Sequence, residues 1–302
     1  MHQQLQLGCW AEERLVQQNK MKKILCIIFV IINFKCSNTF SQEDPNIVSA
    51  KTQHLFTLSS GMSLHTVRDE MMSPLMHRGT QIPIEFSYRF RGLSKRHTVL
   101  LYYDNTELNS SITNKSIASH YINNLNLNFE YSFATKVKEL EDFNTACYVG
   151  ARFSSMLNMR NHYFSQGMSH ESAEQITSLG IYFLSESYFQ KESNNFLRVE
   201  INIPFISYAL LNNRYNANVS DEFDEIDVEK NILWQLFKKG NFVSFNKLFE
   251  IQADISYNIF VSNFIGFDLR YRFQYYSFAQ YQSLLHSKVL NNQFLIGMMV
   301  KL

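Results

Sequence analysis

Residues 249–275, FEIQADISYNIFVSNFIGFDLRYRFQY, contain two long stretches in which apolar and polar residues alternate. Every second residue is apolar from Phe249 to Val261, and the pattern resumes from Ile265 to Tyr275. A period of two places apolar side chains on one face of a β-strand and polar side chains on the other. Both stretches exceed the roughly 5–6 residues of an average soluble strand, and both are as long as the roughly 9–11 residues that cross a bilayer. We therefore expect two neighbouring strands of a transmembrane β-barrel.

The same alternation recurs along the rest of the chain, most clearly in 82–91, 124–133 and 196–205. Because each segment has one apolar and one polar face, we predict an all-β fold: a transmembrane, antiparallel, up-and-down β-barrel. Ten strands fit the pattern best, and eight to twelve are compatible with it. The predicted strands are 53–62, 82–91, 97–104, 124–133, 144–156, 177–189, 196–205, 249–262, 264–275 and 292–302.

The segments that connect these strands alternate between long and short. Outer-membrane barrels have long extracellular loops and short periplasmic turns, which is the arrangement predicted here. With the first strand running outward, every long connection lies outside and both chain ends lie in the periplasm. The connections in order are 63–81, 92–96, 105–121, 135–143, 157–176, 190–194, 206–248, 263 and 276–291.

A soluble β-sandwich is the alternative for any single strand, because a sheet packed on one core also alternates. Two observations favour the membrane barrel: the strands are long, and their apolar faces are rich in aromatic residues. The chain has 26 Phe and 16 Tyr against two Trp. Aromatic residues near strand ends suit the two membrane interfaces. The residues assigned to such girdles are Tyr88, Phe90, Tyr131, Phe133, Tyr275, Tyr276 and Phe278.

The N-terminal part reads as an export signal. Met21-Lys22-Lys23 is a basic start, residues 24–34 (ILCIIFVIINF) are apolar, and small residues precede a cleavage site between Ser41 and Gln42. We expect 21–41 to be a secretory signal peptide, 1–20 to be a mis-assigned extension ahead of the true start, and 42–302 to be the barrel. A transmembrane anchor is the alternative, but 11 apolar residues are too few to span a bilayer as a helix.

Charge and cysteine content limit the partners. The chain has 28 Lys and Arg against 27 Asp and Glu, so it lacks the basic excess typical of nucleic-acid binding, and no nucleic-acid partner is expected. Three of the four cysteines, Cys9, Cys26 and Cys36, lie in 1–41. Only Cys147 remains in the expected mature chain, which therefore cannot form an intramolecular disulfide.

The leader, the alternating strands and the C-terminal segment 292–302 (NQFLIGMMVKL preceded by Asn291) together resemble small Gram-negative outer-membrane β-barrel proteins. In that family the last strand commonly ends in an aromatic or apolar residue, and here it ends in Leu302. The resemblance implies an outer-membrane location. It also implies contact with outer-membrane lipid and lipopolysaccharide, and recognition of 292–302 by the barrel-insertion machinery. A porin-like role is a further implication, since the likeness is architectural and no motif of a specific member is present.

The polar faces of the strands carry charges of both signs, and the alternation directs them into the lumen. A ten-stranded barrel is narrow, so these charges could pair and plug it, or they could line a narrow pore for small polar or anionic solutes. If Arg89, Arg91, Arg270 and Arg272 lay together, they would attract anions. The predicted lumen-lining charges are Glu85, Arg89, Arg91, Glu130, Arg152, Arg198, Glu200, Asp254, Asp268, Arg270 and Arg272.

The longest connection, 206–248, contains an acidic run at 221–229 (DEFDEIDVE). Its carboxylates could bind divalent cations, but the run lacks the glycine and spacing of a calcium loop, so a solvated extracellular loop is the simpler interpretation. Its flanks could extend the adjoining strands or fold inward as a lid. Pro204 is expected to bend or end the strand ladder where that extension begins.

A catalytic role requires His with Ser or Asp converging near the outer rim, as in a protease or lipid hydrolase. Neither the Ser–His neighbours along the chain nor the spacing of the histidines matches a hydrolase or metal motif. We therefore expect surface-loop histidines, no cofactor, no metal and no catalysis, with an outer-membrane protease or lipid hydrolase as the remaining alternative. The residues considered are His65, His77, His120, His162, Ser165, Ser169, His170 and His286.

Overall fold

A computed structural model describes residues 52–70, 73, 75–110, 120–141, 144–164, 169–189, 195–213, 241–280 and 285–302. Contacts divide the chain into Met1–Val48 and Ser49–Leu302, and all the described residues belong to the second unit. The expected leader and the acidic run 221–229 lie outside the described residues. None of the helices in the described part of the chain is long and apolar enough to cross a membrane.

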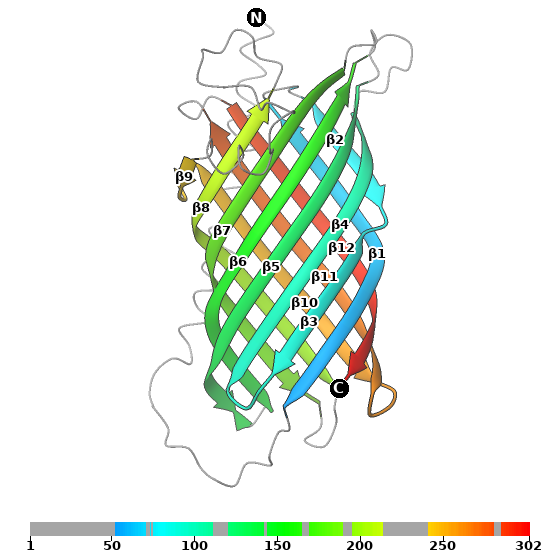
Figure 1. Ribbon diagram of the computed structural model, residues 1–302, viewed down its shortest axis with the longest axis vertical. Coiled ribbons are helices and arrows are strands. Elements are labelled where there is room, and N and C mark those ends of the chain that lie inside the picture. Colours follow the sequence, from blue (N-terminus) through cyan, green and yellow to red (C-terminus); the bar gives the residue numbers. More distant parts are fainter. Residues whose placement is uncertain are drawn as a thin grey trace, which may run out of the picture. The chain divides into compact units, whose positions relative to one another are not determined.

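Twelve antiparallel strand segments of Ser49–Leu302 form one sheet that closes on itself, because β12 pairs with both β11 and β1 (Figure 1). When β2 with β3, and β9 with β10, are each taken as one interrupted strand, consecutive strands are neighbours throughout, which makes the topology up-and-down. The segments are β1 Gln53–Asp69, β2 Met76–Gln81, β3 Ile84–Arg91, β4 Lys95–Ser110, β5 Tyr121–Leu140, β6 Thr145–Tyr163, β7 Ser169–Tyr188, β8 Phe196–Asn213, β9 Asn241–Val243, β10 Leu248–Phe260, β11 Ile265–Gln280 and β12 Leu285–Lys301.

The twelve segments make ten strands of the barrel, the number predicted. β2 and β3 both lie between β1 and β4, and are parts of one barrel strand interrupted at Pro83, which has no N–H to donate. β9 and β10 both pair with β8, on either side of a turn in which the amides of Lys247 and Leu248 bond to the carbonyl of Ser244. The predicted fold class, a closed antiparallel barrel, is confirmed.

The register defines the tilt of the strands. Starting from Ser59 and following register partners around one side of the ring leads to Ala209 of β8. Following them around the other side leads to Phe196 of the same strand. The offset between Ala209 and Phe196 along β8 is 13 residues, and one of these is the extra residue of a β-bulge opposite Gly180. A shear of about 12 over ten strands corresponds to a tilt of about 40°, in the range usual for closed barrels.

Pro204 lies at this bulge. β7 continues to pair with β8 on both sides of it, but the register shifts because Leu179 pairs with Ile206 and Gly180 pairs with Pro204. On the other edge of β8, pairing with β10 stops at Asn202 and resumes with β9 at Ser207. Pro204 therefore interrupts one ladder, as expected, but it does not end the strand.

The two ends of the barrel differ. At the short-turn end the strands join over 92–94, 141–144, 189–195 and 261–264. At the other end, the long-loop end, the strands run further than predicted: β6 reaches Tyr163 rather than 156, and β11 reaches Gln280 rather than 275. Much of what the sequence indicated as extracellular loop is therefore strand, and the barrel is longer than a bilayer requires.

Candidate functional site: the barrel interior

The predicted lumen-lining charges all lie inside the barrel. Each of the eleven residues is at most 9% exposed, and each side chain makes at least one ion pair or hydrogen bond with another interior side chain. Burial of a charge is costly unless it is paired, so the pairs decide whether the interior is stable. Ten of the eleven belong to two groups in the middle of the barrel, which are connected by the 3.8 Å contact between Arg152 Nη1 and Asp254 Oδ2, and Arg91 pairs with Glu186 nearer the short-turn end.

The first group involves β3, β10 and β11. Arg272 lies between two carboxylates, with Nη1 2.7 Å from Glu85 Oε2 and Nε 2.6 Å from Asp254 Oδ1. Arg270 also pairs with Glu85, and bonds to Asp268 on its own strand. Arg89 joins from β3, with Nη2 2.7 Å from Asp268 Oδ2. The arginines of this group are thus neutralised by carboxylates, and do not form the open basic cluster that would attract anions.

The second group involves β5, β6 and β8. Arg152 pairs with Glu130, with Nη1 3.3 Å from Oε2, and with Glu200. Arg198 also pairs with Glu200, which accepts a further hydrogen bond of 2.7 Å from the hydroxyl of Tyr182. A cavity of about 10 Å³ lies between the two groups, next to Arg89, Arg152, Arg270 and Arg272. That volume holds one water at most.

Interior hydrogen bonds connect strands that lie four positions apart in the ring of ten, nearly opposite each other. Arg198 of β8 donates to Thr98 of β4 at 3.0 Å. Arg91 of β3 donates to Glu186 of β7 at 3.1 Å, nearer the short-turn end. At the other end Asn158 of β6 donates to Tyr276 of β11 at 2.8 Å. The lumen is therefore crossed by side chains at several levels.

Several interior charges were not among the predicted ones. Most lie where the strands run past the predicted ends or on the polar face of weakly patterned segments, whereas Glu250 lies within the predicted strand 249–262 and was omitted. The same alternation, extended by a few residues, would have found them. They are Asp69, Arg96, Asp104, Arg160, Glu174, Glu186 and Glu250, all at most 7% exposed.

Outward-facing residues change character towards the long-loop end. On β1 the exposed Leu58, Met62 and Leu64 give way to Thr66 and Arg68. On β4 the exposed Leu101 and Tyr103 give way to Asn105, Glu107 and Asn109. The outward face of the central barrel is an apolar belt, and a polar section of barrel lies beyond it. Only the belt matches the hydrocarbon region of a membrane.

Inside that polar section the lumen is lined by apolar side chains from almost every strand. We call this cluster the apolar collar; it packs between the ion-pair groups and the long-loop rim, and its members are at most 7% exposed. Tyr276 and Phe278 belong to the collar and therefore face the lumen. Their assignment to a girdle at a membrane interface is wrong. The collar consists of Val67, Leu108, Ile122, Met156, Ile176, Ala209, Val243, Leu248, Tyr276, Phe278 and Val289.

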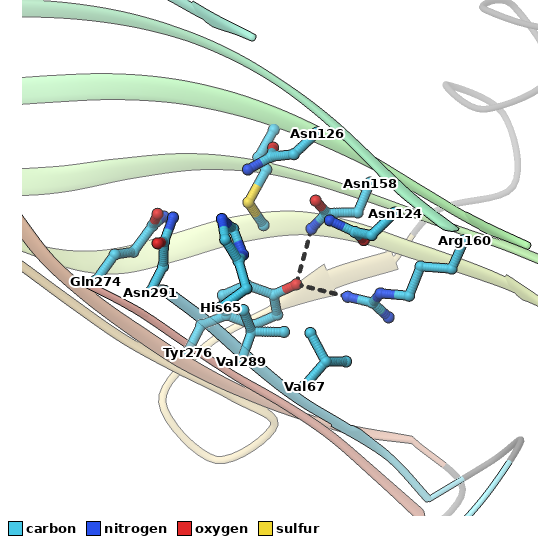
Figure 2. A pocket seen from close by; sticks show the side chains of 11 residues that line it. His65, Val67, Asn124, Asn126, Asn158, Arg160, Gln274, Tyr276, Val289 and Asn291 are labelled. Carbon is cyan, nitrogen blue, oxygen red and sulfur yellow. Dashed lines mark hydrogen bonds between the residues drawn. The ribbon is translucent and has the colours of Figure 1, made fainter. Parts of the chain in front are cut away.

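A small polar chamber lies beside the collar (Figure 2). The hydroxyl of Tyr276 points across it to Asn158, and accepts a second bond of 3.0 Å from Arg160 Nη2. His65 faces the same space, while its Nε2 lies 3.2 Å from Asp104. The cavity measures about 10 Å³, enough for a single water and too small for a substrate.

Three histidines form a chain at the rim above the collar. His77 Nε2 lies 3.1 Å from His120 Nδ1, and His120 Nε2 lies 3.3 Å from His162 Nδ1. All three are at most 6% exposed, and so is His65. The expectation that these histidines lie on surface loops is wrong, because the strands continue into the predicted loops and turn the side chains inward. Ser165 lies outside the described residues, as do the side chains of Ser169 and His170.

The histidine chain does not have the geometry of a Ser–His–Asp triad. Ser172 Oγ lies 3.4 Å from His162 Nε2, and Asp69 Oδ2 lies 3.9 Å from that same nitrogen. In a triad the serine and the acid use different ring nitrogens. Here Nδ1 of His162 is occupied by His120. Within the described ranges no group of three or more His, Cys, Asp or Glu residues is arranged to hold a metal ion.

Burial lowers the pKa of two of these rings, His77 and His120, which lie beyond the apolar belt. Desolvation, with the neighbouring His120 second, lowers the pKa of His77 to about 4. Desolvation also lowers the pKa of His120. The two rings are therefore neutral near pH 7, and their charged forms are disfavoured while they stay buried.

No protein-family model and no curated protein matches the chain. Three solved structures that it resembles are the outer membrane protease OmpT of Escherichia coli, the translocator domain of the autotransporter NalP of Neisseria meningitidis, and the Neisserial surface protein A. Their TM-scores are 0.46, 0.41 and 0.29, at 7%, 8% and 12% identity. The matches cover 87%, 85% and 81% of this chain, and 100%, 90% and 96% of the others.

These proteins share an architecture and not a role, since a protease, a translocator and a surface protein are among them. The chain is similar to these outer-membrane proteins in its barrel fold, and no specific member stands out among them. Scores and identities this low transfer no function.

Proposed function

We propose that the protein is an integral outer-membrane β-barrel with a closed, charged interior that serves a structural or surface-binding role. The apolar belt supports insertion in a membrane, because its outward side chains would otherwise expose a large apolar surface to water. The short-turn end faces the periplasm in this proposal, and the long-loop end faces outward, as in bacterial barrels generally.

The observation that carries the closed interior is the set of bonds between nearly opposite strands. Arg198 to Thr98 and Arg91 to Glu186 place guanidinium groups across the lumen. The apolar collar adds a second obstruction, since ions and polar solutes do not cross a dry apolar constriction readily. Both cavities beside these layers are single-water sized. A narrow passive pore, the alternative from the sequence, would require these layers to separate.

The proposed partners follow from the location. Outer-membrane lipid surrounds the belt, and lipopolysaccharide contacts the polar section beyond it on the outer leaflet. The final segment 292–302, which contains most of β12, is the part that the insertion machinery would recognise. Catalysis is not part of the proposal, since the rim residues come together in a different geometry from that of a hydrolase triad.

Single-channel recording in planar bilayers tests the closed interior. The folded barrel is expected to insert without producing stable conductance steps at neutral pH. Insertion is verified separately by the gel shift between unheated and boiled protein and by protection from protease in vesicles. Reproducible ohmic steps from verified folded protein would contradict the closed interior and favour the pore.

A further inference from the structure

The histidine chain connects three strands at the rim, of which β5 and β6 are also paired in the sheet, whereas β2 and β5 are not neighbours. His77 is on β2, His120 precedes β5, and His162 is on β6. Strand β4 separates β2 from β5, so the contact between His77 and His120 passes over the lumen side of β4, near Ser110. Phe164 stacks on His120 with ring centroids 4.2 Å apart. The rings thus hold three barrel strands together just above the collar.

The number of protons that this chain can accept follows from its geometry. Three rings have six nitrogens, four of which meet in the two ring–ring contacts. A contact between two ring nitrogens requires one hydrogen, because two lone pairs repel and two N–H groups collide. Three neutral rings supply three hydrogens: one for each contact and one for a chain end. A first added proton binds the terminal nitrogen at the other end of the chain of rings. A second added proton has to enter one of the two ring–ring contacts, where two N–H groups then face each other.

The charges around the chain come from several strands. Asp69 of β1 is 3.9 Å from His162, and Arg160 of β6 is 3.5 Å from Asp69. Glu174 of β7 pairs with Arg160 at 2.7 Å and accepts a bond from Tyr276 of β11. His170 of β7 is the register partner of His162. The carboxylates are thus shared with Arg160, so they compensate a single added proton better than two.

We propose that His77, His120 and His162 form a proton-operated latch, which holds the long-loop rim closed at neutral pH and releases β2 from β5 and β6 in acid. Release uncovers the collar beneath the rings, where Leu108 and Ile122 lie on β4 and β5. The stimulus is external acidity, which rests on the proposed orientation of the barrel with the long-loop end facing outward. This inference goes beyond the closed interior, because the ion-pair groups deeper in the barrel do not contain these rings.

The pH range over which the latch opens follows from the lowered pKa of the buried rings. An exposed histidine titrates near 6.5, whereas burial lowers the pKa of His77 to about 4. The open rim therefore takes up protons below about 6.5 that the closed rim cannot hold. The closed form keeps its full advantage above that pH, and loses it progressively as the pH falls towards 4.

Spin-label distances test the latch directly. Labels are attached to Arg78→Cys on β2 and Asn161→Cys on β6, two outward-facing positions, in a Cys147→Ser background that removes the cysteine of the barrel. At pH 7.5 a single narrow distance distribution is expected. At pH 4.5 the distribution should lengthen and broaden, with a midpoint between 6.5 and 4 and full reversal on neutralisation. An unchanged distribution across this range would overturn the proposal.

A substitution within the chain distinguishes the latch from general acid sensitivity. His120→Gln removes the central ring, and is expected to abolish the acid-dependent change in distance. His97→Gln is the control: this histidine faces outward near the short-turn end, bonded to Tyr131, and its loss should leave the change intact. The proposal would be overturned if His120→Gln showed the same change in label distance in acid as the protein with all three histidines. It would also be overturned if the distance between the labels changed with added Zn²⁺ rather than with pH. If His120→Gln does not fold, His77→Gln, which removes one contact, decides by the same criterion.

Conductance separates this inference from the proposed function. At pH 4.5 the open rim still leaves the ion-pair groups across the lumen, so a released latch with no channel activity is expected. Channel steps at neutral pH would contradict only the closed interior, and a fixed rim distance in acid would contradict only the latch.

Discussion

The middle and the long-loop end of the barrel use the same strands with opposite polarity. On β4, Tyr103 faces outward and Asp104 inward in the middle of the barrel, whereas a few residues further Glu107 faces outward and Leu108 inward. β5 shows the same change, from outward Phe129 and inward Glu130 to outward Asn123 and inward Ile122. The proposed membrane location explains the reversal, because the middle of the barrel then faces lipid and the long-loop end faces water. Lipid favours apolar side chains outward and leaves the polar groups to pair inside; in water, apolar side chains gain by packing inside.

The stabilising interactions therefore differ between the two regions. The middle depends on paired charges, for which the loss of one partner is severe and the pair itself contributes little. The long-loop end depends on an apolar core like that of a soluble protein, for which the cost scales with the volume removed. Substitutions on the two faces of each region test this distinction.

Removal of one charge from the middle is expected to have the largest effect. Arg272→Ala leaves Glu85 and Asp254 buried without their shared cation, and should lower the free energy of unfolding by about 3–5 kcal/mol. Denaturant unfolding in lipid vesicles measures it. The control is Lys136→Ala, whose partner Glu139 is exposed, with an expected loss below about 1 kcal/mol. Similar losses for the two variants would show that the interior charges are hydrated rather than buried.

A cavity in the collar is expected to rank second. Leu108→Ala removes a fully buried side chain from the long-loop end, at a cost of about 2–5 kcal/mol. Leu101→Ala, on the same strand, removes a side chain that is 50% exposed on the belt. Lipid fills the space left there, so a loss of about 1–2 kcal/mol is expected. Denaturant unfolding measures both losses. An equal loss of unfolding free energy for Leu101→Ala and Leu108→Ala would contradict the distinction between the collar and the belt.

The smallest effect is expected on the outward face of the long-loop end. Arg68 pairs with Glu70 at 3.3 Å, and both side chains are partly exposed. Arg68→Ala should therefore cost less than about 1 kcal/mol, and the difference should shrink as salt is raised. A larger, salt-independent loss in the same unfolding measurement would mean that this face is covered, and that the apolar belt extends further than the side chains indicate.

Several features of the fold could be read from the sequence because they are local. The alternation in 249–275 gave strands β10 and β11 and their short connection, since a residue's face depends only on its position in the strand. The strand ends were less predictable. In 157–163 the outward residues are no longer uniformly apolar, because they leave the belt, and a search for apolar alternation stops there although β6 continues. The buried histidines were missed for the same reason.

The sequence by itself determined the closed antiparallel barrel, its ten strands and the inward direction of the charges, because a period of two and the spacing of turns are properties of short segments. Only the tertiary structure decided which charges meet. The pairing of Arg272 with Glu85 and the chain from His77 to His162 join residues far apart along the sequence. Their positions depend on the tilt and register of the whole ring, which no single strand encodes.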